Sequence, residues 1–428
     1  MKSTESINYP EMALVKQRLY ASKLRNLQDT LQSSISALPV LNQTKPGDTV
    51  AVAVGSRGID QIDRVLYVCL NCLKEKGLRP YIVPAMGGHG GGTAEGQKDV
   101  LSKLGITEAA MGVPIVADMD VMHFSTLSDR LKIFFSQKAL EADHIIIINR
   151  VKPHTKFEAE IESGLCKMLA VGLGKVRGAA EFHGKAVHQS FRIIEDAAKA
   201  ILNQCDILFG IALLEDGYGD LAHAEAVAPP LFIETDKRLL KEAVKNMARI
   251  PFDFLDILII DFIGKDISGI GMDSNVTGRH RDIVGDFFSA PHAKRIFVRD
   301  LSPGSDGNGN GIGLADFTTK RLVDALDMDK TYMNAITAIS PEKAAIPMSF
   351  DNDFKTMATC ARTIGLDAME KARIVRIKDT ASLGLLQVSK ALEPEILSNE
   401  DLEQITPWQP FRFDDKGNLL NLADGIRY

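Results

Sequence analysis

The sequence predicts an α/β protein of two α/β domains, with a Rossmann-like parallel sheet in the N-terminal domain. Three observations lead to this prediction. The chain has 428 residues, which is more than one hydrophobic core of ordinary size accommodates. Short apolar runs alternate with segments of helical period along the chain. The clearest apolar runs end in glycine-rich or polar loops, as the strands of a parallel sheet do.

The first clear unit of this pattern spans residues 49–87. An apolar run ends at Gly55, a helical pattern follows and stops at Gly77, and a second apolar run ends at Pro84. This order is typical of a β–α–β crossover, so we expect two parallel strands. The loops GSRGID and AMGGHGGGTAEGQ then follow the carboxyl ends of these strands, where ligands bind in such sheets.

The rest of the chain repeats the alternation. DHIIIINRVKPH predicts a third strand, the glycine-rich segment 163–187 leads to a helix beginning near 188, and residues 205–227 predict two strands joined by a turn. A charged helix at about 236–248 reads as a solvent-facing connector. We therefore expect domains at 1–250 and 251–428, with the active site in the cleft between them and a flexible loop at 304–313.

Composition excludes several classes of protein. The chain is 45% hydrophobic with a net charge of −6, so it offers no general attraction for nucleic acid or anionic membranes. No apolar run reaches the about 18 residues of a membrane span, and the N-terminus lacks a signal-peptide core. Five cysteines without scaffold spacing suit a reducing compartment, so we expect a cytoplasmic protein. Cys69 and Cys72 lie in a helical pattern that favours packing over a redox or zinc pair.

His89 is the first candidate functional residue. It lies in GGHGGGTAEG, where the flanking glycines allow close backbone approach to a ligand and leave the imidazole exposed. A histidine of the core would not need such surroundings. Glycine-rich loops also cradle phosphates, so a phosphate nest is the alternative, although no Walker A motif is matched.

Three further residues stand out. His154 closes the third predicted strand behind Pro153, and its alternative role is a structural or capping histidine. Lys167 lies in the apolar segment SGLCKMLAVGLG, where a lysine either extends to solvent or is a desolvated, nucleophilic amine. His183 and His188 are five residues apart, which is not the spacing of a helical metal pair, so we expect one of them to face a site.

In this order, Arg57, His89, His154, Lys167 and His183 resemble the lactate racemase family, whose enzymes use a nickel-pincer nucleotide. PAMGGHGGGTAEG is similar to the family's Gly-Thr-His-type loop, and PHTKFEAEIESGLCKMLAVGLG is similar to its Pro-His, lysine and glycine motif. His183 follows Lys167 by 16 residues, as in the family. The resemblance extends from about residue 45 to residue 280.

The resemblance implies a racemase or epimerase that inverts C2 of a 2-hydroxy acid. Lys167 would anchor the pyridinium cofactor through a thioamide, and His183 would be the one protein ligand of the nickel. His89 and His154 would act as the acid/base pair, one at each face of the substrate, since imidazole serves as either acid or base near pH 7. Cofactor-biosynthesis proteins would then be partners of this chain.

Substrate binding follows the family less closely. Arg57 would bind the substrate carboxylate or a cofactor group, with Ser56 beside it at the cofactor. GKDISGIGMDSNVTGR starts like the family's second-domain stretch at Lys265 but lacks its Gln and Lys, and Arg279 or Asn275 would take their place. We therefore expect Lys265 and Arg279 to contact a substrate other than lactate, or larger than it.

Two rival functions use the same residues. The first is a non-catalytic protein that binds the nickel nucleotide without turnover. The second is a nucleotide- or sugar-phosphate-binding α/β enzyme with GGHGGG as its phosphate nest, which predicts activity without nickel and no modification of Lys167. A metal hydrolase has less support, because the histidines are widely spread and lack helical ligand spacing.

Overall fold

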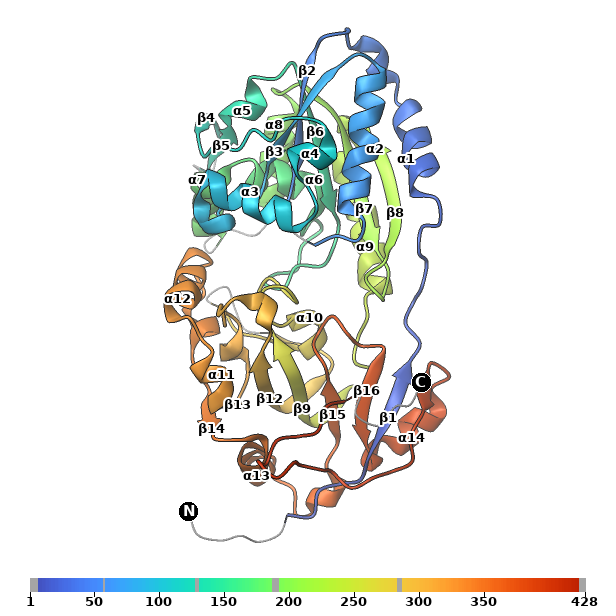
Figure 1. The fold of residues 1–428 in the computed structure, drawn as a ribbon, viewed down its shortest axis with the longest axis vertical. Helices are drawn as coiled ribbons and strands as arrows, with labels where there is room; N and C mark the ends of the chain where they lie inside the picture. Colours follow the sequence, from blue (N-terminus) through green and yellow to red (C-terminus); the bar gives the residue numbers. More distant parts are fainter. Residues whose placement is uncertain (1–6, 57, 128–130, 187–191, 283–286, 423–428) are drawn as a thin grey trace. The chain divides into compact units, whose positions relative to one another are not determined.

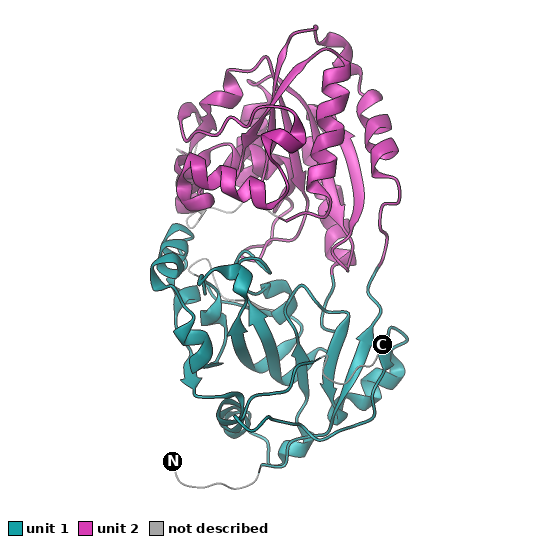
Figure 2. Ribbon diagram, viewed as in Figure 1, with its two compact units in different colours: residues 1–20, 248–428 teal, residues 21–247 magenta. Residues whose placement is uncertain are grey.

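The computed structural model describes residues 7–56, 58–127, 131–186, 192–282 and 287–422. The chain forms two compact units, which Figure 2 shows in different colours. One unit is residues 21–247, and the other combines residues 1–20 with residues 248–428. Each unit holds a sheet with parallel strands, so the predicted α/β class is confirmed.

The unit of residues 21–247 has a five-stranded sheet in the order β3-β2-β6-β7-β8 (Figure 1). Its strands are β2 (Thr49–Val54), β3 (Arg79–Pro84), β6 (His144–Arg150), β7 (Ile207–Glu215) and β8 (Leu221–Val227). All neighbours are parallel except β7 and β8. The predicted crossover is confirmed, and β3 and β6 flank β2 on opposite sides. In such a sheet the gap between the ends of β2 and β6 is the topological switch point, where ligands bind.

This unit also contains helices and a hairpin around its sheet. They are α1 (Leu27–Ser36), α2 (Ile62–Glu75), α3 (Ala94–Lys103), α4 (Glu108–Met111), the hairpin β4 (Val121–Thr126) and β5 (Lys132–Ser136), α5 (Gln137–Leu140), α8 (Ile193–Leu202) and α9 (Phe232–Asn246). On α2, Cys69 is buried in the core and Cys72 packs against it, both as free thiols. The packing interpretation of this pair is confirmed.

The glycine-rich segment after β6 is helical, not irregular. It forms α6 (Gly164–Lys167), a π-helical turn (Met168–Gly172) and α7 (Lys175–Ala186). The helix predicted after this segment is confirmed as α8, within the described residues. The glycines of the segment itself do not prevent helix formation, because tertiary packing overrides helix propensity. Here α7 packs on β5, and a Cβ on Gly174 would lie 3.1 Å from the carbonyl oxygen of Phe134.

The helix α9 is not the solvent-facing connector that its charges suggested. Phe232, Asp236 and Leu239 on one of its faces are buried. Asp236 is 1% exposed, and its carboxylate accepts the N–H groups of Leu165 at 3.0 Å and Cys166 at 2.8 Å. A carboxylate at the first turn of α6 satisfies amides that have no partner within the helix. Burial nevertheless raises the pKa of Asp236 to about 6.

Gly164 makes this contact possible. It has a φ of +85°, and a Cβ there would lie 2.1 Å from an oxygen of Asp236. We expect Gly164→Ala to destabilise the unit more than Gly219→Ala does. Gly219 has a φ of +83° with no atom within 4 Å of a Cβ, so alanine there costs only the left-handed backbone, about 1–2 kcal/mol.

Differential scanning calorimetry of the two glycine variants measures this difference. Adding Asp236→Ala to Gly164→Ala removes the overlapping carboxylate, so the double variant is expected to lose less than the sum of the single losses. Equal losses at Gly164 and Gly219 would contradict the close approach of α6 and Asp236.

The other unit has an eight-stranded mixed sheet in the order β14-β13-β12-β9-β15-β16-β1-β17. Its strands are β1 (Met12–Gln17), β9 (Phe254–Ile263), β12 (His292–Leu301), β13 (Phe317–Thr319), β14 (Met348–Phe350), β15 (Ile374–Ile377), β16 (Leu385–Ser389) and β17 (Leu402–Gln404), with a separate short ladder of β10 (Arg279–His280) and β11 (Phe287–Phe288). Its helices are α10 (Ser274–Thr277), α11 (Lys320–Asp324), α12 (Met328–Thr337), α13 (Asp353–Thr363) and α14 (Glu393–Ser398).

The structure of this unit differs from two of the sequence predictions. Residues 1–20 belong to it and not to the predicted domain 1–250, because β1 pairs antiparallel with β16 and β17. The predicted boundary near 250 lies close to the observed division after residue 247. The segment 304–313 is not a flexible loop, since Asn310 and Ile312 are buried and a Cβ on Gly311 would overlap the carbonyl oxygen of Ile270.

Candidate functional site at the carboxyl edge of the parallel sheet

The loops after β2, β3 and β6 meet α6 and the π-helical turn at one edge of the unit 21–247. The side chain of Asn149 donates to the carbonyl oxygen of Gly164 at 2.7 Å. A Cβ on Gly55 would lie 3.1 Å from the Cε of Met168. The N–H of Gly87 donates to the carbonyl oxygen of Gly172 at 3.2 Å. These contacts gather the loops that carry Ser56, His89 and His154 around the short helix that carries Lys167.

His89 is exposed and its Nδ1 hydrogen-bonds with the hydroxyl of Ser56, which lies in the loop after β2. The hydroxyl can donate to this nitrogen or accept from it, so either tautomer of the ring is compatible with the contact. The bond fixes the ring relative to the switch point. Arg57, which was predicted beside it, lies outside the described residues.

The glycines after His89 pack on the helix that follows them. Gly90, Gly91 and Gly92 form a 3₁₀ turn with positive φ. The carbonyl oxygen of Gly90 lies within 2 Å of where a Cβ on Gly96 would be, and the Thr93 hydroxyl accepts the Gly96 N–H at 3.1 Å. Oxygens of the loop itself thus lie at the N-terminus of α3, which leaves less room there for the phosphate of the rival function.

His154 and Lys167 share two neighbours. The ring centroids of His154 and Phe157 are 4.2 Å apart, and the Nζ of Lys167 lies 5.3 Å from the centroid of the same Phe157 ring. Lys167 also donates to the carbonyl oxygen of Glu162 at 3.0 Å, while the Glu162 carboxylate accepts the N–H of His154 at 2.6 Å. The structure therefore brings together two residues that lie thirteen positions apart in the sequence.

Glu162 and the backbone N–H of Lys156 make further hydrogen bonds in this cluster. The carboxylate of Glu162 also accepts the N–H of Ala159 at 3.0 Å, and its burial raises its pKa. The N–H of Lys156 donates to the Nδ1 of His154 at 3.2 Å. The neutral ring of His154 therefore carries its proton on Nε2.

His183 is half-buried in the last turn of α7, which contacts the π-helical turn after Lys167. Its ring meets that of Phe182 edge to face. His188 lies outside the described residues. Within the described part of the chain, no group of three or more His, Cys, Asp or Glu side chains is arranged to hold a metal ion.

The side chains present fit a nickel-pincer nucleotide. A half-buried amine at Lys167 and a half-buried imidazole at His183 lie on helices that contact the same π-helical turn. The Phe157 ring beside the amine offers an apolar face for a planar group. Imidazole suits nickel, and the two sulfurs and ring carbon would come from the cofactor itself.

Lys175 is a residue of this region that sequence reasoning missed. It is fully buried, its φ is +53°, and its Nζ donates to the carbonyl oxygen of Pro84 at 2.6 Å and to Gln97 Oε1 at 3.2 Å. Burial lowers the pKa of Lys175 from 10.5 to about 8, and the nearby Asp118 opposes this shift. Its position within the glycine-rich segment 163–187 gave no signal, because lysines are mostly exposed to solvent.

The depressed pKa of Lys175 predicts an unusual pH dependence. The unfolded chain keeps this proton up to pH 10.5, whereas the folded chain releases it near pH 8. Between these values the unfolded state binds more protons, so the contribution of Lys175 to stability grows as the pH rises. We expect the unfolding free energy of the wild type to rise relative to that of Lys175→Met between pH 8 and pH 10.

Denaturant titrations at several pH values measure this difference. Lys138→Met is the matched control, because Lys138 is an exposed lysine that pairs with Glu141 and its pKa is raised. The control difference is expected to stay flat up to pH 10. A flat or falling difference for Lys175→Met would contradict the depressed pKa.

Lys265 and Arg279 belong to the other unit. Lys265 follows the carboxyl end of β9, and its Nζ contacts the carbonyl oxygen of Gly269 and lies 2.9 Å from Asn334 Oδ1. Arg279 pairs with Asp316 and donates to the carbonyl oxygen of Ala293 at 2.8 Å. Their predicted contact with substrate stays a prediction.

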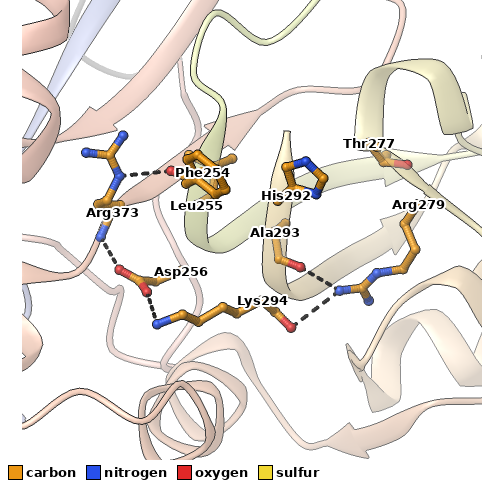
Figure 3. Close-up of a pocket in the computed structure, with 10 residues that line it drawn as sticks. Phe254, Leu255, Asp256, Thr277, Arg279, His292, Ala293, Lys294 and Arg373 are labelled. Atoms are coloured by element: carbon orange, nitrogen blue, oxygen red, sulfur yellow. Dashed lines mark hydrogen bonds and ion pairs between the residues drawn. The ribbon is translucent and has the colours of Figure 1, made fainter. Parts of the chain in front are cut away.

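Arg279 also lines a cavity of about 390 Å³, shown in Figure 3. The cavity lies at the amino-terminal ends of β9 and β12, the edge of a parallel sheet opposite to that where ligands usually bind. Asp256 in its wall pairs with Lys294 at 2.8 Å and accepts the N–H of Arg373. In Figure 3, dashed lines join Arg373 and Lys294 to Asp256 and join Arg279 to two backbone carbonyl oxygens, so these charged groups are paired within the cavity wall.

No curated protein matches this chain. Among solved structures, it is similar to the lactate racemase apoprotein from Thermoanaerobacterium thermosaccharolyticum, with 13% identity, a TM-score of 0.49, and coverage of 93% of this chain and 92% of that one. In the described residues, no helix has the length and apolar character needed to cross a membrane. The model of a domain of unknown function, DUF362, matches residues 63–369, and the chain belongs to the DUF362 family.

Proposed function

We propose that this protein is a racemase or epimerase that inverts C2 of a 2-hydroxy acid, with a nickel-pincer nucleotide held by Lys167 and His183. The observation that carries the proposal is the cluster in which His154 and Lys167 share Phe157 and Glu162. The resemblance to the lactate racemase family assigns these two residues to one active site. Their proximity at the switch point supports that assignment.

The two histidines would move protons to and from the substrate hydroxyl. His154 holds its exchangeable proton on Nε2, because Nδ1 accepts the N–H of Lys156. It is therefore set to donate to a substrate oxygen. His89 can present either tautomer beside Ser56, so its Nε2 can take a proton when the Ser56 hydroxyl accepts from Nδ1. Inversion needs an acid and a base that can exchange roles, and imidazoles do this near neutral pH.

Lys167 and His183 would hold the cofactor, the amine through a covalent bond and the imidazole through the metal. When bound, a nickel-pincer nucleotide supplies a reversible hydride acceptor, which removes the need to ionise a carbon-bound hydrogen that is barely acidic. The buried carboxylate of Asp236 fixes α6 from its first turn, and Glu162 fixes the amine from the preceding loop. Both contacts restrict where the amine lies.

The substrate would be an anion larger than lactate. At this edge the amine of Lys167 lies beside His154, and both would face a carboxylate substrate. The stretch after Lys265 is rich in glycine and lacks the family's Gln and Lys, which favours a longer or polyhydroxylated acid.

The test is an inversion assay on single enantiomers of lactate, malate and aldonic acids. The protein is co-expressed with enzymes that make the cofactor, and chiral chromatography follows both enantiomers. We expect inversion of an acid larger than lactate, with nickel required. Inversion of lactate alone would contradict the substrate proposal. Binding of nickel nucleotide without turnover, or turnover of a phosphorylated substrate without nickel, would support one of the rival functions.

A further inference from the structure

Lys175 and Gln97 form a continuous buried chain of hydrogen bonds between the core and the His89 loop. The Nζ of Lys175 donates to the last carbonyl oxygen of β3, that of Pro84, and to the side-chain oxygen of Gln97. Gln97 lies on α3 and is 0% exposed. Its Nε2 donates to the carbonyl oxygen of Gly87 at 3.0 Å and to that of His89 at 3.4 Å.

A buried lysine bound to amide oxygens needs a physical explanation. Burying an ammonium group is unfavourable unless its donors are satisfied, and a hydrophobic side chain of similar size often stabilises a fold as well or better. Asp118 compensates for part of the cost by its negative charge. In some proteins such a buried group fixes a specific arrangement at a cost in stability.

Lys175 and Gln97 hold the loop that carries His89, which has much conformational freedom. Residues 87–92 include five glycines around one histidine, and Gly87, Gly90, Gly91 and Gly92 have positive φ. Glycines lose more conformational entropy on folding than other residues do. Proton transfer, however, requires the imidazole to lie within hydrogen-bond reach of the substrate. The loop therefore needs fixing from outside itself.

We propose that Lys175 and Gln97 position the His89 loop (residues 87–92) and are therefore positioning residues for proton transfer at His89. We call this pair the Lys175–Gln97 bracket. The bracket holds the carbonyl groups on both sides of Gly88, while Ser56 holds the ring. The part of this inference that concerns proton transfer rests on the proposed function. The part that concerns the loop does not.

Hydrogen exchange of the segment 86–93, measured by mass spectrometry, tests the bracket without any substrate. The N–H groups of Gly87 and His89 are hydrogen-bonded in this segment. Gln97→Met removes both donors to the loop, and Lys175→Met leaves the oxygens of Pro84 and Gln97 without their donor. We expect exchange of the segment about tenfold faster in each variant, since the loss of a buried hydrogen bond changes local opening by a factor of about this size.

The matched control is Val65→Ala. Val65 is 0% exposed on α2 in the same unit, so its truncation destabilises the core without touching the bracket. The imidazole NMR signals of His89, assigned with His89→Gln, give a second readout. They are expected to move in both bracket variants and to stay in place in Val65→Ala.

The outcomes separate the two proposals. Unchanged exchange and unchanged His89 signals in both bracket variants would overturn the inference, whatever the activity. Equal acceleration in Val65→Ala would also overturn it, because the effect would then be general destabilisation. Faster exchange in the bracket variants alone supports the bracket, even if the wild type shows no inversion, in which case the proposed function fails. In active protein, Gln97→Met is expected to lower kcat with little change in KM.

Discussion

His154→Gln is expected to lower kcat for inversion of the 2-hydroxy acid by about 10²–10⁴-fold, the usual contribution of a positioned acid or base. Glutamine keeps a polar side chain of similar length but cannot exchange a proton near neutral pH. The backbone contacts of the loop through Glu162 do not depend on the imidazole, so the fold should be kept. Steady-state kinetics with chiral detection, in both directions of inversion, measures the loss.

His89→Gln is expected to show a loss in the same range, and the double variant a loss smaller than the product of the two, since residues that act as a unit are not additive. His144→Gln is the matched control. His144 is a half-buried histidine at the start of β6, the opposite end of that strand, where it contacts Asp48. Wild-type turnover in His154→Gln would show that His154 is structural, the alternative that the sequence left open.

Lys167→Arg is expected to reduce inversion to the level of protein made without the cofactor. A guanidinium keeps the charge but cannot form the proposed thioamide, so the covalent link to the cofactor is lost. The variant should also lack the mass increase that the wild type acquires on co-expression with the cofactor-making enzymes. Intact mass spectrometry and inversion assays on the same samples measure both effects.

Lys138→Arg is the control for this change, because Lys138 is an exposed lysine of the same unit that pairs with Glu141. It should keep both the mass increase and the activity. Full activity in Lys167→Arg would contradict a covalent role for Lys167, and activity that survives without nickel would exclude the proposed mechanism altogether.

The sequence predicted the parts of this fold that local pattern determines. The apolar runs before Gly55 and Pro84 and the helical period between them indicated β2, α2 and β3, and with them the edge where His89 lies. The strand before His154 was predicted for the same reason. Period and punctuation are local signals, and they need no knowledge of partners.

Features that depend on distant partners were not predictable in this way. Asp236 caps a helix 71 positions away, and its charge alone suggested a solvated helix. Lys175 and Gln97 meet across 78 positions. β1 pairs with β16 and β17, which lie still further from it along the sequence. In each case tertiary packing overrides the local tendency, so a single sequence gives no signal for it.

The measurement that tests the central claim most directly is intact mass with metal analysis of this protein purified from its native source. The account predicts a covalent mass increase that peptide mapping places on Lys167, together with about one nickel per chain, as a single imidazole ligand and a tridentate cofactor require. An unmodified chain that carries no nickel in that sample would contradict it.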